Sequence, residues 1–165
     1  MAKPTKFAPH ICAACTVLAL LGVVLGFWLS SPLIMVILLL PTALYEAYRT
    51  EGKSTKAASL LLVAVLLAEI FLVLFNIDFN LANFLGNDQQ YIAGYLIPLG
   101  DIRVVGPTLM AVLSVILLAR TRGIYTRWLA VVVIIGSFAI VYGLDPLVFQ
   151  DLFKLAVDEG LKRVY

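Results

Sequence analysis

Charged side chains are scarce in this sequence: 13% of its 165 residues are Asp, Glu, Lys or Arg. A soluble domain of this size exposes far more charge, whereas 62% of the residues here are hydrophobic and the mean hydropathy is +1.03. The net charge of +2 is small, and the basic residues lie between apolar segments, unlike those of a nucleic-acid-binding surface. The composition therefore predicts an integral membrane protein and excludes nucleic acid as a partner.

The motifs of common enzymes and cofactor sites are also missing. A single histidine excludes a haem held by two histidines of this chain, and it does not support chlorophyll-type ligation through several buried histidines. The sequence contains no P-loop, no dinucleotide-binding glycine pattern, no metalloprotease helix and no nucleophile elbow. We therefore expect no enzymatic activity and predict no cofactor, while bound lipid or pigment stays open.

Five long apolar segments fill most of the chain, each near the length at which an α-helix crosses a hydrocarbon core of roughly 30 Å. They are Ile11–Leu29, Pro32–Tyr48, Ala57–Ile77, Val104–Ala119 and Trp128–Gly143. Ser31 and Pro32 divide the first two, because Ser is favoured at an N-cap and Pro at the first helical position. The predicted fold is all-α: a five-helix transmembrane bundle over residues 1–143, an outer interfacial loop over 78–101, and a C-terminal amphipathic interfacial tail over 144–165.

The basic residues predict the orientation of the bundle. Positive charge is enriched in the short cytoplasmic loops of membrane proteins, and clusters of Lys and Arg occupy every second junction here. A cytoplasmic N-terminus places eight of them inside: Lys3, Lys6, Arg49, Lys53, Lys56, Arg120, Arg122 and Arg127. It leaves four outside: Arg103, Lys154, Lys162 and Arg163. We therefore expect a prokaryotic cytoplasmic membrane, with the N-terminus cytoplasmic and the C-terminus outside.

Glu69 stands out as an ionisable side chain within an apolar segment, whereas Glu46 is counted with the charges of the inner side. Glu69 lies roughly 18 Å along a helix from Ala57, at 1.5 Å per residue. A carboxylate at that depth is costly, so we expect it to be protonated, hydrogen-bonded or paired. Arg103 begins the fourth helix on the same side, which predicts an intramembrane polar pair of Glu69 and Arg103. A proton or cation path, a contact to a polar substrate or headgroup, and a structural hydrogen bond all remain open.

The first apolar segment begins with a compact set of metal-binding residue types, His10, Cys12 and Cys15. Cys-X-X-Cys places two thiols on one helix face, so these residues are candidates for metal binding or redox exchange. The competing interpretation is helix packing, which we favour because no fourth ligand is evident and the small residues continue as a GxxxG motif. That packing face recurs at spacings of three and four: Cys12, Cys15, Ala19, Gly22 and Gly26.

The size of the chain ranks three functional hypotheses. Five short helices leave little material for a translocation pathway with two gates. The leading expectation is therefore an accessory or structural subunit of a multisubunit membrane complex, which packs against other membrane subunits and against lipid or pigment. One alternative is a small transport or channel subunit that uses Glu69. The other is a membrane redox or metal-binding protein that uses His10, Cys12 and Cys15.

Overall fold

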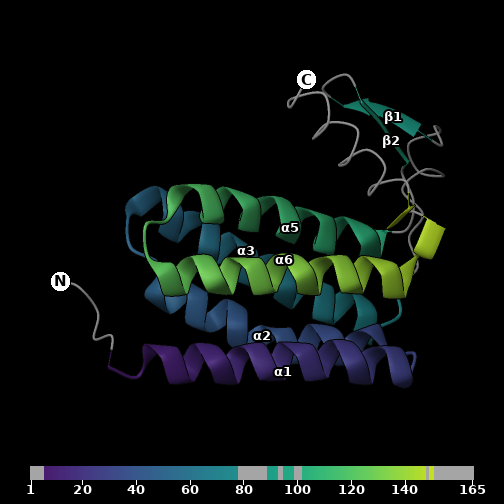
Figure 1. Cartoon of the computed structure of the whole chain (residues 1–165). Coiled ribbons are helices and arrows are strands. Elements are labelled where there is room, and N and C mark those ends of the chain that lie inside the picture. The colour runs from purple at the N-terminus through teal and green to yellow at the C-terminus, as the bar shows by residue number, and fades with distance from the viewer. Residues whose placement is uncertain (1–5, 78–88, 93–94, 99–101, 148, 151–165) are drawn as a thin grey trace, which may run out of the picture.

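The computed structural model describes residues 6–77, 89–92, 95–98, 102–147 and 149–150. Its five long helices lie side by side (Figure 1). They are α1 Ala8–Trp28, α2 Pro32–Arg49, α3 Lys53–Leu74, α5 Ile102–Arg120 and α6 Ile124–Leu144. Each contains a span long and apolar enough to cross a membrane, which confirms the predicted helical bundle with five candidate spans.

Several helices extend beyond the apolar segments that predicted them. The helix α1 begins three residues before Ile11, and α3 and α6 begin four residues before Ala57 and Trp128. The added first turns contain polar residues, because backbone hydrogen bonding continues a helix past the point where its side chains cease to be apolar. Hydropathy therefore located the helices, although it did not locate their first turns.

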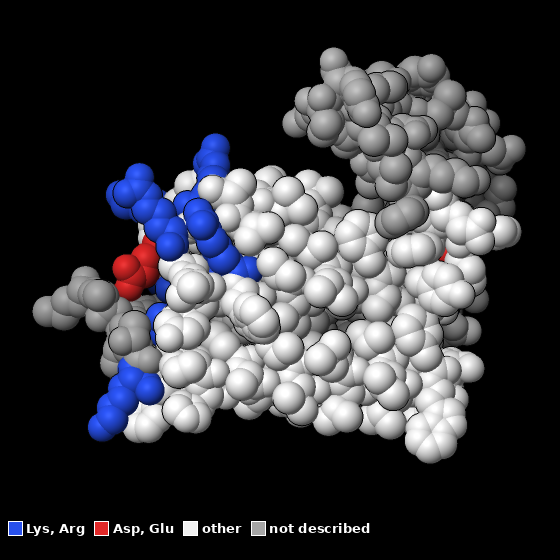
Figure 2. All heavy atoms as spheres, viewed as in Figure 1, with Lys and Arg blue, Asp and Glu red and all other residues white. Residues whose placement is uncertain are grey.

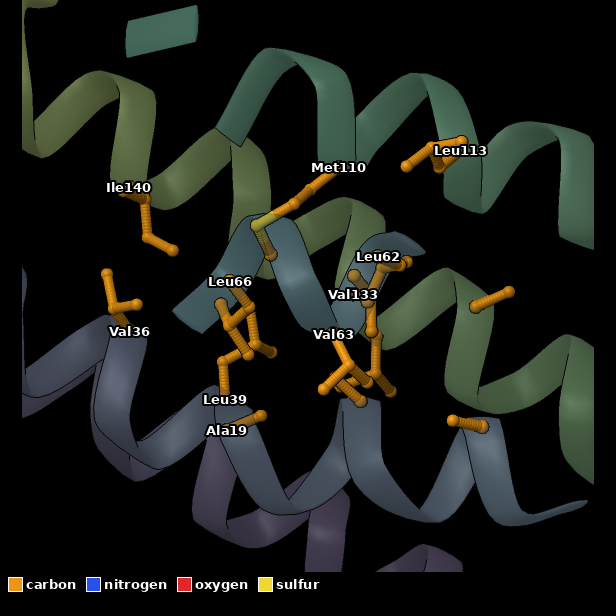
Figure 3. Close-up of a cluster of buried hydrophobic side chains, with 14 of the residues drawn as sticks. Ala19, Val36, Leu39, Leu62, Val63, Leu66, Met110, Leu113, Val133 and Ile140 are labelled. Carbon is orange, nitrogen blue, oxygen red and sulfur yellow. The ribbon is translucent and has the colours of Figure 1, made fainter. Parts of the chain in front are cut away.

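Four of the helices form a closed ring, and the fifth packs on its outside. The helix α2 contacts α3, α3 contacts α5, α5 contacts α6, and α6 returns to α2, while α1 packs against α2 and α6. The centre of the ring is filled by apolar side chains that are at most 1% exposed (Figure 3). They include Leu39, Leu62, Leu66, Met110 and Val133. Among the described residues, Ala19 is the one buried side chain that α1 contributes to this main core cluster.

The helices α1 and α3 end in the same backbone motif. Ser30 and Asn76 adopt positive φ angles of 49° and 48°, each two residues past the last helical residue. After α1, the Ser31 amide donates to the Gly26 carbonyl at 2.9 Å and the Ser30 amide to the Phe27 carbonyl at 3.3 Å. The equivalent pair of bonds follows α3, so both helices end in a Schellman motif without its usual glycine.

The connection between α3 and α5 contains a short antiparallel hairpin. Strand β1 (Gln89–Ile92) pairs with β2 (Tyr95–Pro98), with Gln89 opposite Pro98 and Ile92 opposite Tyr95. Figure 1 places this hairpin outside the helical bundle. Eight residues of the predicted outer interfacial loop over 78–101 thus form two short strands, which the sequence analysis did not predict. The remainder of that segment lies outside the described residues, as does most of the predicted amphipathic tail, including 151–165.

Basic side chains gather at one end of the bundle (Figure 2). This end, called the basic end below, carries Lys6, Arg49, Lys53, Lys56, Arg120, Arg122 and Arg127. In the described part of the chain, the opposite end contributes one basic residue, Arg103. The alternation of charge along the sequence thus corresponds to a separation of charge between the two ends of the bundle.

Candidate functional site

Glu69 is completely buried between α3 and α5, at 0% exposure. Its carboxyl group occupies the space where a Cβ on Gly106 of α5 would lie. A side chain at Gly106 would therefore collide with the carboxylate, and the absence of one lets the two helices approach closely there. Glu69 is held at a tight helix contact near the opposite end of the bundle.

Arg103 precedes Gly106 by three residues, so it lies on the same side of α5 as the contact with Glu69. Its guanidinium donates a hydrogen bond of 3.1 Å to Oδ1 of Asn76, which follows the end of α3. Both members of the predicted polar pair therefore belong to the packing of α3 against α5. Whether they act together in function stays a prediction.

Glu46 is a second buried carboxylate, which the sequence analysis missed. It lies inside α2 at 0% exposure, although the sequence analysis counted it with the charges of the inner side. A signal was available: Glu46 follows Leu39 by seven residues and Ala43 by three, the spacing of one helix face, and both of these are buried. Within the described part of the chain, neither carboxylate oxygen of Glu46 has a hydrogen-bond partner.

Arg49 is the last residue of α2 and lies about one helical turn beyond Glu46, at the basic end. Its guanidinium carbon lies 5.9 Å from the ring centroid of Tyr45 and 5.5 Å from that of Tyr125 on α6. Its Nη1 also donates to the Tyr45 hydroxyl at 3.5 Å. Cation–π attraction to two rings holds the charged group where water is partly excluded. Arg49 therefore packs against two aromatic rings at the end of α2, three residues after Glu46.

Cys12 and Cys15 are buried beside this region, where they cluster with Leu129 of α6. The backbone carbonyl of Cys15 accepts a hydrogen bond of 3.2 Å from the hydroxyl of Thr42. His10 is exposed, so the structure does not gather the three candidate ligands at one point. The described residues contain no group of three or more His, Cys, Asp or Glu side chains arranged to hold a metal ion.

The remaining predicted packing residues of α1 lie against neighbouring helices inside the chain. Ala19 is buried in the main core cluster, and Gly22 and Gly26 are buried against α2. A Cβ on Gly22 would come within 2.7 Å of Leu38 Cβ, and one on Gly26 would collide with the side chain of Met35. The GxxxG face is therefore already occupied by the chain's own second helix.

Hydroxyl groups lie in the core between the two carboxylates. Ser114 of α5 and Ser137 of α6 are both 0% exposed, and their oxygens have no hydrogen-bond partner among the described residues. The four buried threonines of the described residues instead donate to backbone carbonyls, as Thr50 does to the Glu46 carbonyl at 2.8 Å. An unsatisfied buried polar group costs on the order of 1–3 kcal/mol, so these sites are retained against a penalty.

The two carboxylates are separated along the bundle axis. Glu46 lies three residues before the end of α2 and Glu69 sixteen residues into the antiparallel α3, which places them on the order of 20 Å apart along the axis. The apolar side chains of Figure 3, including Leu39 and Leu62, fill the core between them. The arrangement can hold a proton or a polar contact at each end, but its centre offers no continuous row of polar groups among the described residues.

Comparison with known proteins adds no family to this description. No protein-family model, no curated protein and no solved structure matches the chain.

Proposed function

We propose that the chain is an accessory subunit of a multisubunit membrane complex, which packs against other membrane proteins and performs no chemistry of its own. The observation that carries this proposal is the closed core: Leu39, Leu62 and Met110 are at most 1% exposed between the two carboxylates. A core packed with large apolar side chains does not conduct polar solutes. The function then lies on the outer surface of the bundle.

The helix α3 is the best candidate for the partner-binding surface. It is the least buried of the five candidate spans, with 22% of its span inside the bundle, and it packs against α2 and α5. Ala64 and Ala68 are exposed on it at a spacing of four, next to the exposed Leu67. Small residues at this spacing let a second transmembrane helix approach closely. The glycines of α1 serve that purpose within the chain, whereas these alanines are available to a partner.

The membrane orientation is part of the same proposal. The gathering of Lys and Arg at the basic end favours a cytoplasmic location for that end, in a prokaryotic cytoplasmic membrane. In sealed cells, a membrane-impermeant thiol reagent should label Ser31→Cys and spare Ser54→Cys, each introduced into a chain whose native cysteines are replaced by alanine. The reverse labelling pattern would contradict the orientation.

The mass of the complex after mild solubilisation tests the accessory role. We expect the wild-type chain in an assembly with at least one other membrane protein. Ala64→Phe should release the partner, because a bulky ring on α3 blocks close helix approach. Ala14→Phe is the matched control: Ala14 is an exposed alanine on α1 and should leave the assembly intact. A wild-type chain that is purely monomeric in native membranes, as measured by crosslinking, would rule the proposal out.

The buried carboxylates favour a second candidate, a small transport or channel subunit. Glu46 and Glu69 lie in one core, and Ser114 and Ser137 add buried hydroxyls. Intramembrane carboxylates often mark ion or proton pathways. Proton and cation flux into liposomes should then fall at least tenfold in both Glu46→Gln and Glu69→Gln. Flux equal to that of protein-free liposomes for the wild-type chain would reject this candidate.

A further inference from the structure

An apolar groove runs between α1 and α6 on the outside of the ring. It consists of two adjoining cavities, one of about 480 Å³ nearer the basic end and one of about 200 Å³ farther along the same two helices. Thr16 and Trp128 line both cavities and so mark where they meet. The indole of Trp128 donates to the Thr16 hydroxyl at 2.9 Å, and that hydroxyl donates to the Cys12 carbonyl at 2.7 Å. The polar groups at this junction therefore bond one another, and the remaining lining is mostly hydrocarbon.

The groove has the direction and length of a lipid chain. Its α1 wall extends from Pro9 to Val23, roughly 21 Å at 1.5 Å per residue. Half of a hydrocarbon core of roughly 30 Å is about 15 Å, the depth of one leaflet. An acyl chain lying parallel to the helices therefore fits the groove.

Positive charge surrounds the mouth of the groove at the basic end. Lys6 precedes the lining residue Pro9 by three positions, and Arg122 precedes the lining residue Ile124 by two. Arg127, next to Trp128, is also exposed; its Nε donates a hydrogen bond of 2.8 Å to the Thr121 carbonyl, which leaves its terminal nitrogens for a phosphate. Figure 2 shows the basic side chains gathered at this end. Among the described residues the exposed acidic group there is Glu51, which belongs to the α2–α3 connection and not to the groove.

We propose that the groove binds one anionic phospholipid from the leaflet at the basic end. One of its two acyl chains lies between α1 and α6, and its phosphate is held near Lys6 and Arg127. Burial of the chain supplies affinity, and the basic residues select an anionic headgroup. The site does not rest on the accessory role, because a monomeric chain retains the whole groove.

Native mass spectrometry of the full chain in detergent tests this site. With added phosphatidylglycerol we expect one tightly bound lipid, and with phosphatidylcholine of the same chain length at least tenfold weaker binding. Ala13→Phe should abolish tight binding, because Ala13 lines the groove and a phenyl ring fills it. Ala14→Phe adds the same ring at the next residue, which is exposed but does not line the groove, and should bind as the wild type does.

Charge variants separate headgroup selection from burial of the acyl chain. Lys6→Gln and Arg127→Gln should each weaken phosphatidylglycerol binding about fivefold, the effect of one basic residue near an anionic surface. Lys53→Gln and Lys56→Gln on α3 are the controls and should have no effect. Unfolding curves check that each variant folds.

Three results would overturn the proposal: equal affinity for both lipids, equal binding by Ala13→Phe and Ala14→Phe, or loss of a co-purified protein from Ala13→Phe with lipid binding unchanged. The last result would make the groove a protein-docking site. A monomeric mass without a partner protein would instead refute the accessory role and leave the lipid site standing.

Discussion

Glu46 and Glu69 are the same residue type in the same core, yet their surroundings differ. Glu69 is fitted against the backbone of α5, where Gly106 leaves room for its carboxyl group. Glu46 lies three residues before Arg49 near the end of α2, and its oxygens have no hydrogen-bond partner in the described part of the chain. Both carboxylates are buried, and the Glu69 carboxyl group is in addition part of a tight contact between two helices.

A buried polar side chain can be retained for packing or for function. A polar side chain that fills a space shaped for it contributes to packing, and its removal leaves a cavity. A polar side chain without bonding partners lowers stability, so its retention suggests a role other than stability. Glu46, which hydropathy did not single out, is therefore a candidate for a functional group beside Glu69.

The largest expected effect comes from breaking the Glu69 contact. Gly106→Ala should lower the free energy of unfolding by about 2–3 kcal/mol, because the new methyl group collides with the Glu69 carboxylate in a packed core. Reversible unfolding in mixed detergent micelles measures the change. Gly143→Ala is the control: its Cβ would lie 3.4 Å from Met35 Cε, an ordinary contact, so stability should change by less than about 0.5 kcal/mol.

A double variant shows whether the collision is the cause. Glu69→Ala removes the carboxyl group, so Gly106→Ala should be much less harmful when combined with it than alone. Additive losses of stability in the double variant would contradict the contact.

The next prediction is that replacing the two carboxylates changes the free energy of unfolding in opposite directions. Glu46→Leu should raise the free energy of unfolding by about 1–2 kcal/mol, because an apolar side chain removes an unsatisfied buried group. Glu69→Leu should lower it by about 1–2 kcal/mol, because leucine is too short to fill the space beside Gly106. The same micelle unfolding assay measures both variants. Changes of the same sign would remove the distinction drawn here.

The smallest expected effect concerns the backbone motifs at the ends of α1 and α3. Ser30→Gly should raise the free energy of unfolding by about 0.5 kcal/mol, because glycine accepts the positive φ of 49° without steric cost. Asn76→Gly should bring no such gain, because Asn tolerates this conformation and its Oδ1 accepts the bond from Arg103. Thermal unfolding of the two variants in one detergent compares them. A larger gain for Asn76→Gly would mean that the link to Arg103 contributes nothing.

Much of the fold could be predicted because a membrane span is a long, continuous signal. The five apolar segments located the five long helices of the described residues, and Pro32 marked the start of α2. The β1–β2 hairpin was missed although its signal was present: Tyr and Ile on both sides of Gly94 favour two short strands. Short strands compete poorly with the stronger pattern of the flanking helices.

The candidate site was harder to predict, because it depends on which helices are neighbours. The role of Gly106 follows from the contact of α3 with α5, and nothing in the local sequence specifies that pairing. Glu46 was misassigned for a different reason. Near the end of an apolar segment a carboxylate resembles a loop charge, and its burial depends on α2 continuing to Arg49.

The turn between α1 and α2 affects how the chain inserts into the membrane during biosynthesis. Leu29, Ser30 and Ser31 carry no charge, and the glycine face of α1 packs against the helix that follows this turn. In the proposed orientation the turn must pass through hydrocarbon during biosynthesis, and the transfer of an uncharged turn avoids the penalty of roughly 2.5–3.5 kcal/mol for each charged residue. The first two helices can therefore enter the bilayer as a packed pair. The later helices then pack against α2 to complete the ring.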